Sequence, residues 1–397
     1  MSMKFIFTTI LLIFQFLNSA EVYSEGLKNE KAFIKKADRH LFKRDYWPTA
    51  DWQLISPQKV GMSEEGLSKL SEYAFARTGD DKNRKGIRTD GIVIIKNGRL
   101  VYEKYARNYT KDRPHLAWSV TKSFVNALYG IARKEGLLRL EDSASKYFPS
   151  LNKEEYKEIK IDDILRMSSG LNWNEGYEAS PLKSSVIAML YTSGREDMAA
   201  FTASRELVHK PGTYLYYSSG DSNLLMSILK NVLKDEYSDY PWKKLFDKIG
   251  MKNVVWERDK SGTFVGSSYI YSTPRDLAKF GYLYLNNGVW GNEKLFSEDW
   301  VDYTTTVAPS FYTTPLYKGL DEHIMTAQWY ANIPDPNRNV KKPLPDAPDD
   351  TFMASGHWGQ KIFVIPSWDM VIVRVADDRD GSFNENHFIK LVKESMR

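Results

Sequence analysis

The sequence contains no cysteine among its 397 residues. The chain therefore forms no disulfide, binds no metal through thiolates, and has neither a cysteine nucleophile nor a lipidated N-terminal cysteine. Histidine is scarce, with six residues, and the pattern His-x-x-x-His that places two zinc ligands on one helical face does not occur. A phosphate-binding glycine loop of the P-loop kind is missing as well. These absences exclude thiol chemistry and argue against the common zinc and nucleotide sites.

A strong excess of either charge is also missing. The 55 basic and 51 acidic side chains leave a formal net charge of +4, which is too small an excess to indicate a nucleic-acid partner. Hydrophobic residues make up 42% and charged residues 27% of the chain, the balance of a globular protein and not of a disordered one. Aromatic residues reach 14% and supply large side chains for a core or for the walls of a pocket.

Long hydrophobic runs are confined to the N-terminus. Met1–Lys4 is a short positive start, Phe5–Leu17 is almost wholly apolar, and the small residues Ser19 and Ala20 follow. Because thirteen residues are too few for a helix across a bilayer of about 30 Å, this layout predicts a signal peptide over residues 1–20, cut after Ala20 or after Ser24. The alternative is an uncleaved anchor or a buried helix. We expect a protein secreted across the inner membrane into the periplasm, with no integral membrane span after cleavage.

The rest of the chain divides by pattern into a lead-in at 21–55, an α/β region at 56–139 and 330–397, and a mainly helical region at 140–329. Asn97-Gly98 joins two β-rich runs and favours a type I′ hairpin turn, because both residues tolerate positive φ. Strand patterns return at 360–365 and 370–375. Strands near both ends predict one sheet built from both termini, with a helical region inserted between them and the active site in the seam. Helices are expected after Ser63 to 75, from Trp118 to near Gly136, and over 162–167, 185–191, 222–233, 275–285 and 387–396.

The first candidate for chemistry is the motif Ser119-Val120-Thr121-Lys122. On a helix, residues three apart lie on one face, so the Lys122 amine can take the hydroxyl proton of Ser119 if burial or a neighbouring positive charge lowers the lysine pKa. The backbone N–H of a serine in the first turn is free to stabilise an oxyanion. Alone, the motif is unspecific, because Ser119 could cap a helix while Lys122 lies on the surface. Lysine also stands at the third position after Ser56, Ser143, Ser150, Ser180 and Ser227.

Two further motifs follow downstream. In Tyr217-Ser218-Ser219, the phenol could relay protons between nucleophile and leaving group if a cationic lysine lies close to it. In Gly356-His357-Trp358-Gly359-Gln360, glycine allows the backbone to approach a substrate, and the N–H of Gln360 could be a second oxyanion donor. The alternatives are aromatic core packing for the first motif and an ordinary strand entry, with a histidine whose hydrogen bonds are satisfied, for the second.

In this order, the three motifs resemble those of the serine β-lactamase and penicillin-binding-protein superfamily, and in particular its class C-like branch. That branch includes class C β-lactamases, D-alanyl-D-alanine carboxypeptidases, family VIII carboxylesterases and 6-aminohexanoate-dimer hydrolases. Connecting phrases extend the resemblance over roughly residues 55–395, and they are Met167–Leu171, Pro211-Gly212 and Thr273–Gly281.

The resemblance implies an α/β (α+β) fold of the β-lactamase/transpeptidase type, with an antiparallel sheet flanked by helices and an inserted all-helical region. It implies a serine hydrolase in which Ser119 attacks a carbonyl, Lys122 and Tyr217 transfer protons, and water releases the acid from an acyl-enzyme. The backbone N–H groups of Ser119 and Gln360 would hold the oxyanion. No metal and no organic cofactor is expected. The sequence leaves open whether Lys122 or Tyr217 is the principal base, because coupled groups share their titration.

The chain departs from the β-lactamase pattern at two positions. Its second motif ends in Ser219 where β-lactamases have asparagine, and its third begins with His357 where they have lysine. Loss of that fixed positive charge weakens the case for a β-lactam carboxylate as the ligand. The overall resemblance is greatest to the 6-aminohexanoate-dimer hydrolases, and Tyr177 lies where those enzymes place a tyrosine that contacts the substrate amide. A plain aromatic lip of the pocket is the alternative for Tyr177.

The expected function is therefore cleavage of an amide or ester bond in a small molecule through an acyl-enzyme on Ser119. Linear amides like the 6-aminohexanoate dimer rank first, carboxylic esters second, and D-alanyl-D-alanine peptides or β-lactams third. A catalytically silent cell-wall binding protein of the same fold is the competing hypothesis from another class. The oligomeric state is not indicated by the sequence. The residues expected to bind substrate are Tyr177, Ser219, His357, Trp358 and Gly359, with Trp118 and Trp173 as further candidates for pocket walls.

Overall fold

The structure is a computed structural model that describes residues 42–396, apart from 78–81, 178–179, 181, 318–319 and 321–323. The predicted signal peptide at 1–20 and residues 21–41 of the predicted lead-in lie outside the described residues. The described part of the lead-in packs against the fold. Arg44 donates to both carboxylate oxygens of Asp369 at 2.7 and 2.6 Å, and Trp52 is buried against Tyr282.

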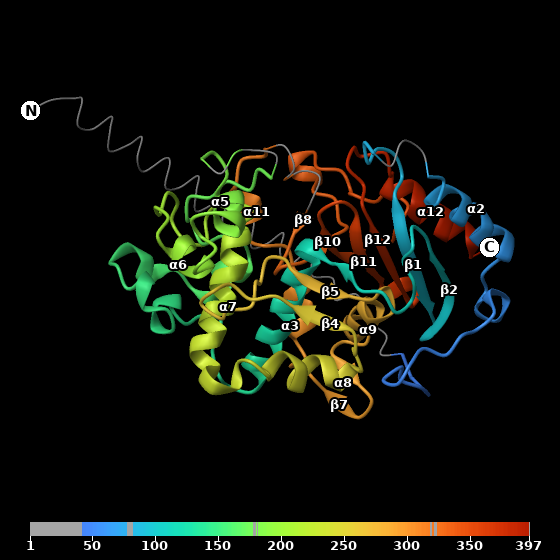
Figure 1. The fold of residues 1–397 in the computed structure, drawn as a ribbon, viewed down its shortest axis with the longest axis horizontal. Coiled ribbons are helices and arrows are strands. Elements are labelled where there is room, and N and C mark those ends of the chain that lie inside the picture. The colour runs from blue at the N-terminus through green and yellow to red at the C-terminus, as the bar shows by residue number, and fades with distance from the viewer. Residues whose placement is uncertain are drawn as a thin grey trace, which may run out of the picture.

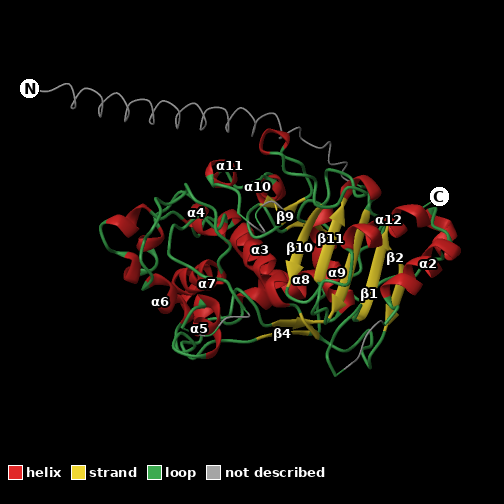
Figure 2. Cartoon of the chain, turned by 90° about the horizontal axis from the view of Figure 1, so that it is seen from above, coloured by secondary structure: helices red, strands yellow, loops and turns green. Residues whose placement is uncertain are grey.

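Within the described residues, the main sheet has seven strands in the order β2-β1-β12-β11-β10-β9-β8 (Figures 1 and 2). All neighbours are antiparallel. Because β1 from the N-terminal part pairs with β12 from the C-terminal part, the prediction of one antiparallel sheet built from both ends is confirmed. The strand bounds are Thr89–Lys96 (β1), Arg99–Tyr105 (β2), Ile324–Met325 (β8), Tyr330–Ala331 (β9), Phe352–Gly356 (β10), Gln360–Ile365 (β11) and Met370–Ala376 (β12).

Helices cover both faces of this sheet. Helices α2 (Glu64–Ala74) and α12 (Glu385–Ser395) pack together on one face, and α9 (Pro274–Leu285) packs on the other. Side chains alternate between the faces of a strand, so Ile92 and Ile94 of β1 join the core under α2 and α12. Val93 and Ile95 join the larger core that contains α9. Burial on both faces explains why these strands read as continuous apolar runs.

Helix α3 (Thr121–Lys134) lies between the sheet and the helical part of the molecule (Figure 1). Every residue from Thr121 to Ala132 is buried, as expected of a helix surrounded by protein on all sides. The 3₁₀ turn Trp118–Val120, which precedes α3, lies against β10 and β11, and this places the Ser119 motif at the seam. The other helices are α4 (Ile161–Leu165), α5 (Ser185–Tyr191), α6 (Met198–Ala203), α7 (Ser219–Leu233), α8 (Asp247–Ile249), α10 (Trp300–Thr305) and α11 (Ser310–Thr313).

Two smaller sheets add strands β4 to β7 to the stretch predicted to be mainly helical and β3 to the predicted α/β region. One has the order β3-β5-β4, and the other is the ribbon β6-β7. Strand β3 precedes the Ser119 motif directly and pairs with β5, so this small sheet helps to fix the entry of the chain into α3. The bounds are His115–Leu116 (β3), Val254–Trp256 (β4), Ile270–Ser272 (β5), Val289–Trp290 (β6) and Glu293–Lys294 (β7).

The local signals in the sequence correspond well to the observed elements. Asn97 and Gly98 both have positive φ, at 52° and 74°, as the type I′ hairpin requires. Ser63 accepts a hydrogen bond from Gly66 N and caps α2, and Thr273 accepts one from Asp276 N and caps α9. Helix α7 begins at Ser219, three residues earlier than expected, because Ser218 caps it. In the part of the chain that the structure describes, no helix is long and apolar enough to span a bilayer.

Candidate active site

Ser119 lies in a 3₁₀ turn, Trp118–Val120, that leads into α3. Its side chain does not cap the helix, since the N-cap residue of α3 is Val120 and no side chain caps it. The capping alternative for Ser119 is therefore wrong. Trp118 and Val120 are buried, whereas Ser119 is partly exposed. The turn thus leaves the Ser119 hydroxyl accessible between two buried side chains, and a nucleophile must be accessible to its substrate.

Lys122 is buried, with 2% of its surface exposed, so the surface-charge alternative is wrong as well. Its Nζ lies 3.1 Å from Ser119 Oγ, 3.1 Å from Ser219 Oγ and 3.0 Å from the carbonyl oxygen of Ser267. Three residues from distant parts of the chain thus converge on one amine, and two of them had been predicted as site residues. The Ser267 carbonyl gave no signal in the sequence, because any residue supplies such a group.

Burial lowers the pKa of Lys122 from 10.5 to about 8, and the charge of Glu175 opposes this shift. Desolvation disfavours the ammonium form, so about a tenth of the amines are neutral at pH 7 and about half at pH 8. A neutral amine beside a serine hydroxyl can accept the hydroxyl proton.

The pH dependence of acylation should follow from this shifted group. Lys122 must be neutral to act as a base, so we expect kcat/KM to rise with pH through about 8 and to fall about tenfold for each unit well below that value. Initial rates on a chromogenic ester, measured between about pH 5.5 and 9.5 and corrected for spontaneous hydrolysis, check this. If kcat/KM did not rise with pH anywhere between about pH 7 and 9, a role for Lys122 as the base would be contradicted.

Tyr217 precedes the cap of α7 and faces the same amine. Lys122 Nζ lies 4.8 Å from the centroid of the Tyr217 ring. Burial raises the pKa of Tyr217 well above 10, while a hydrogen bond with Ser119 acts in the opposite direction. The phenol is therefore protonated near neutral pH and can donate a proton. Tyr330 of β9, which the sequence did not single out, shares a hydrogen bond with Tyr217.

Glu175 is a further site residue that sequence reasoning missed. One of its oxygens accepts from Ser219 Oγ at 2.5 Å, and the other accepts from Ser219 N at 2.9 Å and from Trp173 Nε1 at 2.6 Å. Trp173 is thus buried behind the site and holds this carboxylate. The only signal in the sequence was an acidic residue two positions before Tyr177.

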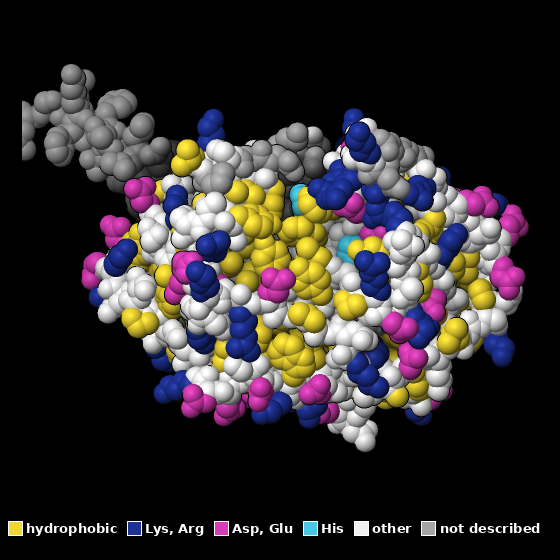
Figure 3. Space-filling view, viewed as in Figure 1, with side chains coloured by type: hydrophobic (Ala, Val, Ile, Leu, Met, Phe, Trp, Pro, Cys, Tyr) yellow, Lys and Arg dark blue, Asp and Glu magenta, His cyan; other side chains and the backbone are white. Residues whose placement is uncertain are grey.

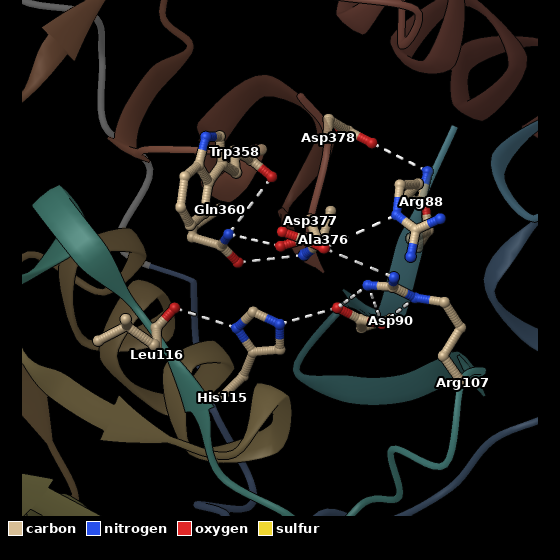
Figure 4. A network of polar contacts seen from close by, with 12 residues as sticks. Arg88, Asp90, Arg107, His115, Leu116, Trp358, Gln360, Ala376, Asp377 and Asp378 are labelled. Carbon is tan, nitrogen blue, oxygen red and sulfur yellow. Dashed lines mark hydrogen bonds and ion pairs between the residues drawn. The ribbon is translucent and has the colours of Figure 1, made fainter. Parts of the chain in front are cut away.

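The turn between β10 and β11 carries the third motif. A Cβ atom on Gly356 would lie 2.4 Å from the backbone oxygen of Ala117, so only glycine lets β10 approach the Ser119 turn this closely. The side chain of Gln360 donates to His357 O at 3.0 Å. It also donates to Ala376 O at 2.7 Å and accepts from Ala376 N at 3.1 Å (Figure 4). The amide side chain therefore fixes the turn to β12. A role for the Gln360 N–H in an oxyanion hole stays a prediction.

Asp378 and Arg374 lie next to Gly359 and Trp358 and support this part of the turn. Gly359 has φ of 91°, and a Cβ atom there would lie 2.5 Å from Asp378 Oδ2, which pairs with the buried Arg374 at 2.5 Å. The amide of Asp378 donates to Trp358 O. Farther along the same edge, Asp90 accepts from Arg107 and pairs with His115 at 2.9 Å (Figure 4). Arg107 also pairs with Asp377 at 3.7 Å, so this second group links β1 with the segment after β12.

Four predicted pocket residues form one aromatic cluster at the site. Trp118 contacts Tyr177, His357 and Trp358 through ring centroids 6.2, 5.6 and 5.1 Å apart. Tyr177 stacks on His357 at 4.9 Å. The hydroxyl of Tyr177 is buried and lies near the hydroxyls of Ser219 and Ser268. Tyr177 thus connects the aromatic cluster with the motif that ends in Ser219.

Backbone strain gathers around the site. A non-glycine residue with positive φ costs of order 1–3 kcal/mol and persists only where its surroundings enforce it. Several such residues line the site or adjoin Ser119, and their φ values are 48° for Trp118, 56° for Met167, 68° for Tyr269, 63° for Gln328 and 61° for Trp358. The fold thus holds this region in a fixed conformation before any ligand binds. In the described residues, no group of three or more histidine, aspartate or glutamate side chains could hold a metal ion.

Comparison with known proteins agrees with this geometry. The sequence pattern of the Beta-lactamase family matches residues 73–392. The chain is 24% identical over 310 residues to the 6-aminohexanoate-dimer hydrolase of Paenarthrobacter ureafaciens, covering 75% of each protein. A class C β-lactamase structure superimposes with a TM-score of 0.57 at 16% identity, over 83% of this chain and 95% of that one. A family VIII carboxylesterase gives 0.60 at 14% identity, over 84% and 98%.

The family match spans most of the chain, and the structural similarities confirm the β-lactamase/transpeptidase-like fold. Members of this family are serine hydrolases, and the chain has a serine, a buried lysine and a tyrosine together at the seam between the sheet and the helical part. The chain therefore belongs to the beta-lactamase family and is a serine hydrolase related to 6-aminohexanoate-dimer hydrolases, carboxypeptidases and esterases.

Proposed function

We propose that the chain hydrolyses an amide or ester bond of a short linear substrate through an acyl-enzyme on Ser119. The observation that carries this proposal is the buried Lys122 amine, held 3.1 Å from a partly exposed Ser119 hydroxyl. Its surroundings lower its pKa toward the pH at which it can act. A binding protein without activity would have no need for a lysine whose burial costs free energy.

The reaction proceeds in two halves. The Ser119 O–H bond breaks, the proton passes to the neutral amine of Lys122, and Oγ bonds to the substrate carbonyl carbon, whose π electrons move to oxygen. The backbone N–H groups of Ser119 and Gln360 stabilise this oxyanion. Collapse breaks the bond to the leaving group, which receives a proton from Tyr217, and the ammonium of Lys122 returns a proton to Tyr217. Water then attacks the ester carbon and gives a proton to Lys122. A second collapse breaks the ester bond, releases the acid and returns that proton to Ser119 Oγ.

Lys122 is the favoured base, and Tyr217 is the favoured proton donor. The pKa of Lys122 is lowered to about 8, whereas that of Tyr217 is raised well above 10. A base must be unprotonated near the working pH, which the lysine achieves and the phenol does not. The Tyr217 hydroxyl, hydrogen-bonded to Ser119, is instead placed to pass a proton to a departing amine or alcohol.

The surroundings of Ser119 favour a substrate with an apolar segment next to the bond that is cleaved. On the face shown in Figure 3, hydrophobic side chains gather between the helical part and the sheet, next to histidine. The aromatic cluster of Trp118, Tyr177, His357 and Trp358 borders Ser119. The third motif carries His357 in place of a lysine, so a fixed charge for a β-lactam carboxylate is missing there. We therefore rank linear amides similar to the 6-aminohexanoate dimer first, with Tyr177 contacting the amide, then small esters, then D-alanyl-D-alanine peptides.

The N-terminal sequence supports export as part of this proposal. A positive start, an apolar run and small residues before Glu21 are typical of a secretory signal peptide. We propose that the protein acts in the periplasm. Intact mass of the exported protein should show cleavage after Ala20 or Ser24, and an uncleaved cytoplasmic product would contradict this part alone.

Covalent labelling tests the proposed function most directly. Incubation with a fluorophosphonate should add one phosphonyl group, and peptide mass spectrometry should place it on Ser119. A substrate panel then ranks kcat/KM for the 6-aminohexanoate dimer, p-nitrophenyl esters, a D-alanyl-D-alanine peptide and penicillin G. A folded protein that stays unlabelled would support the silent binding protein. Penicillin as the best substrate would contradict the substrate ranking.

A further inference from the structure

Glu175 is surrounded by hydrogen-bond donors. Its two carboxylate oxygens accept from the backbone N–H of Ser219, from the indole N–H of Trp173 and from the hydroxyl of Ser219. A carboxylate is acceptor-only when ionised, so the ionised side chain satisfies all three donors. The hydroxyl contact, at 2.5 Å, has the length of a charge-assisted hydrogen bond. The hydroxyl hydrogen of Ser219 is therefore committed to Glu175.

This commitment determines how Lys122 is oriented. A neutral amine has two N–H donors and one lone pair. The carbonyl oxygen of Ser267, at 3.0 Å, can only accept. Ser219 Oγ, at 3.1 Å, can also only accept from the amine, because its own hydrogen points to Glu175. Both N–H groups of the neutral amine are thus used, and the lone pair is left for the third neighbour, the hydroxyl of Ser119 at 3.1 Å.

We propose that Glu175 is a positioning residue for acylation: its carboxylate fixes the hydroxyl of Ser219, and Ser219 in turn directs the lone pair of Lys122 toward Ser119. This inference rests on the proposed function, since it concerns the same proton transfer. Glu175 itself does not touch Ser119. It acts through Ser219, and it also contributes a negative charge close to the amine.

Two effects of Glu175 can be separated by two substitutions. In Glu175→Gln, one oxygen becomes an NH2 group, so the side chain can no longer accept from all three donors, and the negative charge is lost. The charge of Glu175 raises the pKa of Lys122, so its removal should lower that pKa. In Glu175→Asp, the charge stays, but the side chain is one methylene shorter and cannot reach the same three donors.

The experiment measures the second-order rate constant of fluorophosphonate labelling from about pH 5.5 to 9.5 for the wild type and each variant, because this needs no natural substrate. For Glu175→Gln we expect the plateau to fall about tenfold to a hundredfold from the lost orientation. Its acid limb should also move down by about half a unit to one unit. For Glu175→Asp we expect a similar fall with the limb close to that of the wild type. Glu135→Gln, which removes a carboxylate at the opposite end of α3 that binds Lys244, should change neither quantity.

The possible outcomes separate the inference from the proposed function. An unlabelled wild type would refute the proposed function itself. A labelled wild type with an unchanged Glu175→Gln would overturn only the role of Glu175. If Glu175→Gln is labelled more slowly but the acid limb of its pH profile stays where it is in the wild type, the effect is a general structural one. This result would also overturn the inference. Circular dichroism and thermal unfolding identify a variant that has failed to fold. If Glu175→Gln fails to fold, the plateau of the labelling rate constant for Glu175→Asp decides.

Discussion

Replacing Ser119 with alanine is expected to reduce kcat/KM on a p-nitrophenyl ester by at least about 10³-fold and to abolish fluorophosphonate labelling. In the proposed mechanism the Ser119 oxygen forms the covalent bond, so no neighbouring group can replace it. Its removal should cost the fold little, because the side chain is partly exposed and its hydrogen bonds in the site are with Lys122 and Tyr217, which have other contacts. We expect the free energy of unfolding to change by roughly 1 kcal/mol or less.

The control for this variant is a second serine followed by lysine three positions later. Ser227 and Lys230 share that spacing on α7, but Ser227 is buried and Lys230 bonds to Thr263 and Ser261. Ser227→Ala should retain kcat/KM within about twofold once folded. If Ser119→Ala kept most of its activity while remaining folded, the acyl-enzyme on this serine would have to be abandoned.

Replacing Lys122 with methionine should cause a loss of similar size, again at least about 10³-fold in kcat/KM. Methionine keeps much of the apolar stem, so packing is largely preserved while the amine is removed. The hydroxyl of Ser119 then has no base to accept its proton, and the acid limb near pH 8 that we expect from the lowered pKa of Lys122 should disappear. Steady-state kinetics across pH, together with labelling rates, measure both effects.

Lys279 offers a matched comparison, because it is another buried helical lysine away from the site. It pairs with Asp276 at 3.2 Å, and both side chains are 4% exposed. Lys279→Met should lower the free energy of unfolding by several kcal/mol, since it leaves a buried carboxylate without its partner, while kcat/KM of the folded fraction stays near that of the wild type. Equal kinetic losses in both variants would mean that the effect of Lys122→Met is structural.

Much of the fold could be predicted because the strongest local signals are also the ones that tertiary packing preserves. Asn97-Gly98 predicted its hairpin because the turn needs positive φ, and Thr273–Pro274 marks the start of α9 with a cap and a proline. The short strands β8 and β9 and the small sheet around β5 could not be predicted in the same way. Two- and three-residue strands carry too few alternating positions to stand out from loops.

The candidate site likewise contains residues that the sequence could predict and residues that it could not. Ser119, Lys122, Tyr217 and Ser219 belong to spaced motifs, and the structure brings all four together. Tyr330 and the carbonyl of Ser267 have no motif of their own, and their positions depend on where β9 and the chain before β5 are packed. Gln360 was predicted for its backbone N–H, yet the structure also reveals that its side chain ties the turn to β12.

The sequence by itself predicted that Ser119 and Lys122 lie side by side, because residues three apart meet on one helical turn whatever surrounds them. It also determined the order of the motifs that identifies the family. Only the tertiary structure decided that the amine is buried, that Glu175 lies behind Ser219, and that Tyr177 and His357 stack beside Trp118. Burial and hydrogen bonding depend on residues that are far apart in the chain, and those contacts form only when the sheet, α3 and α7 are packed together.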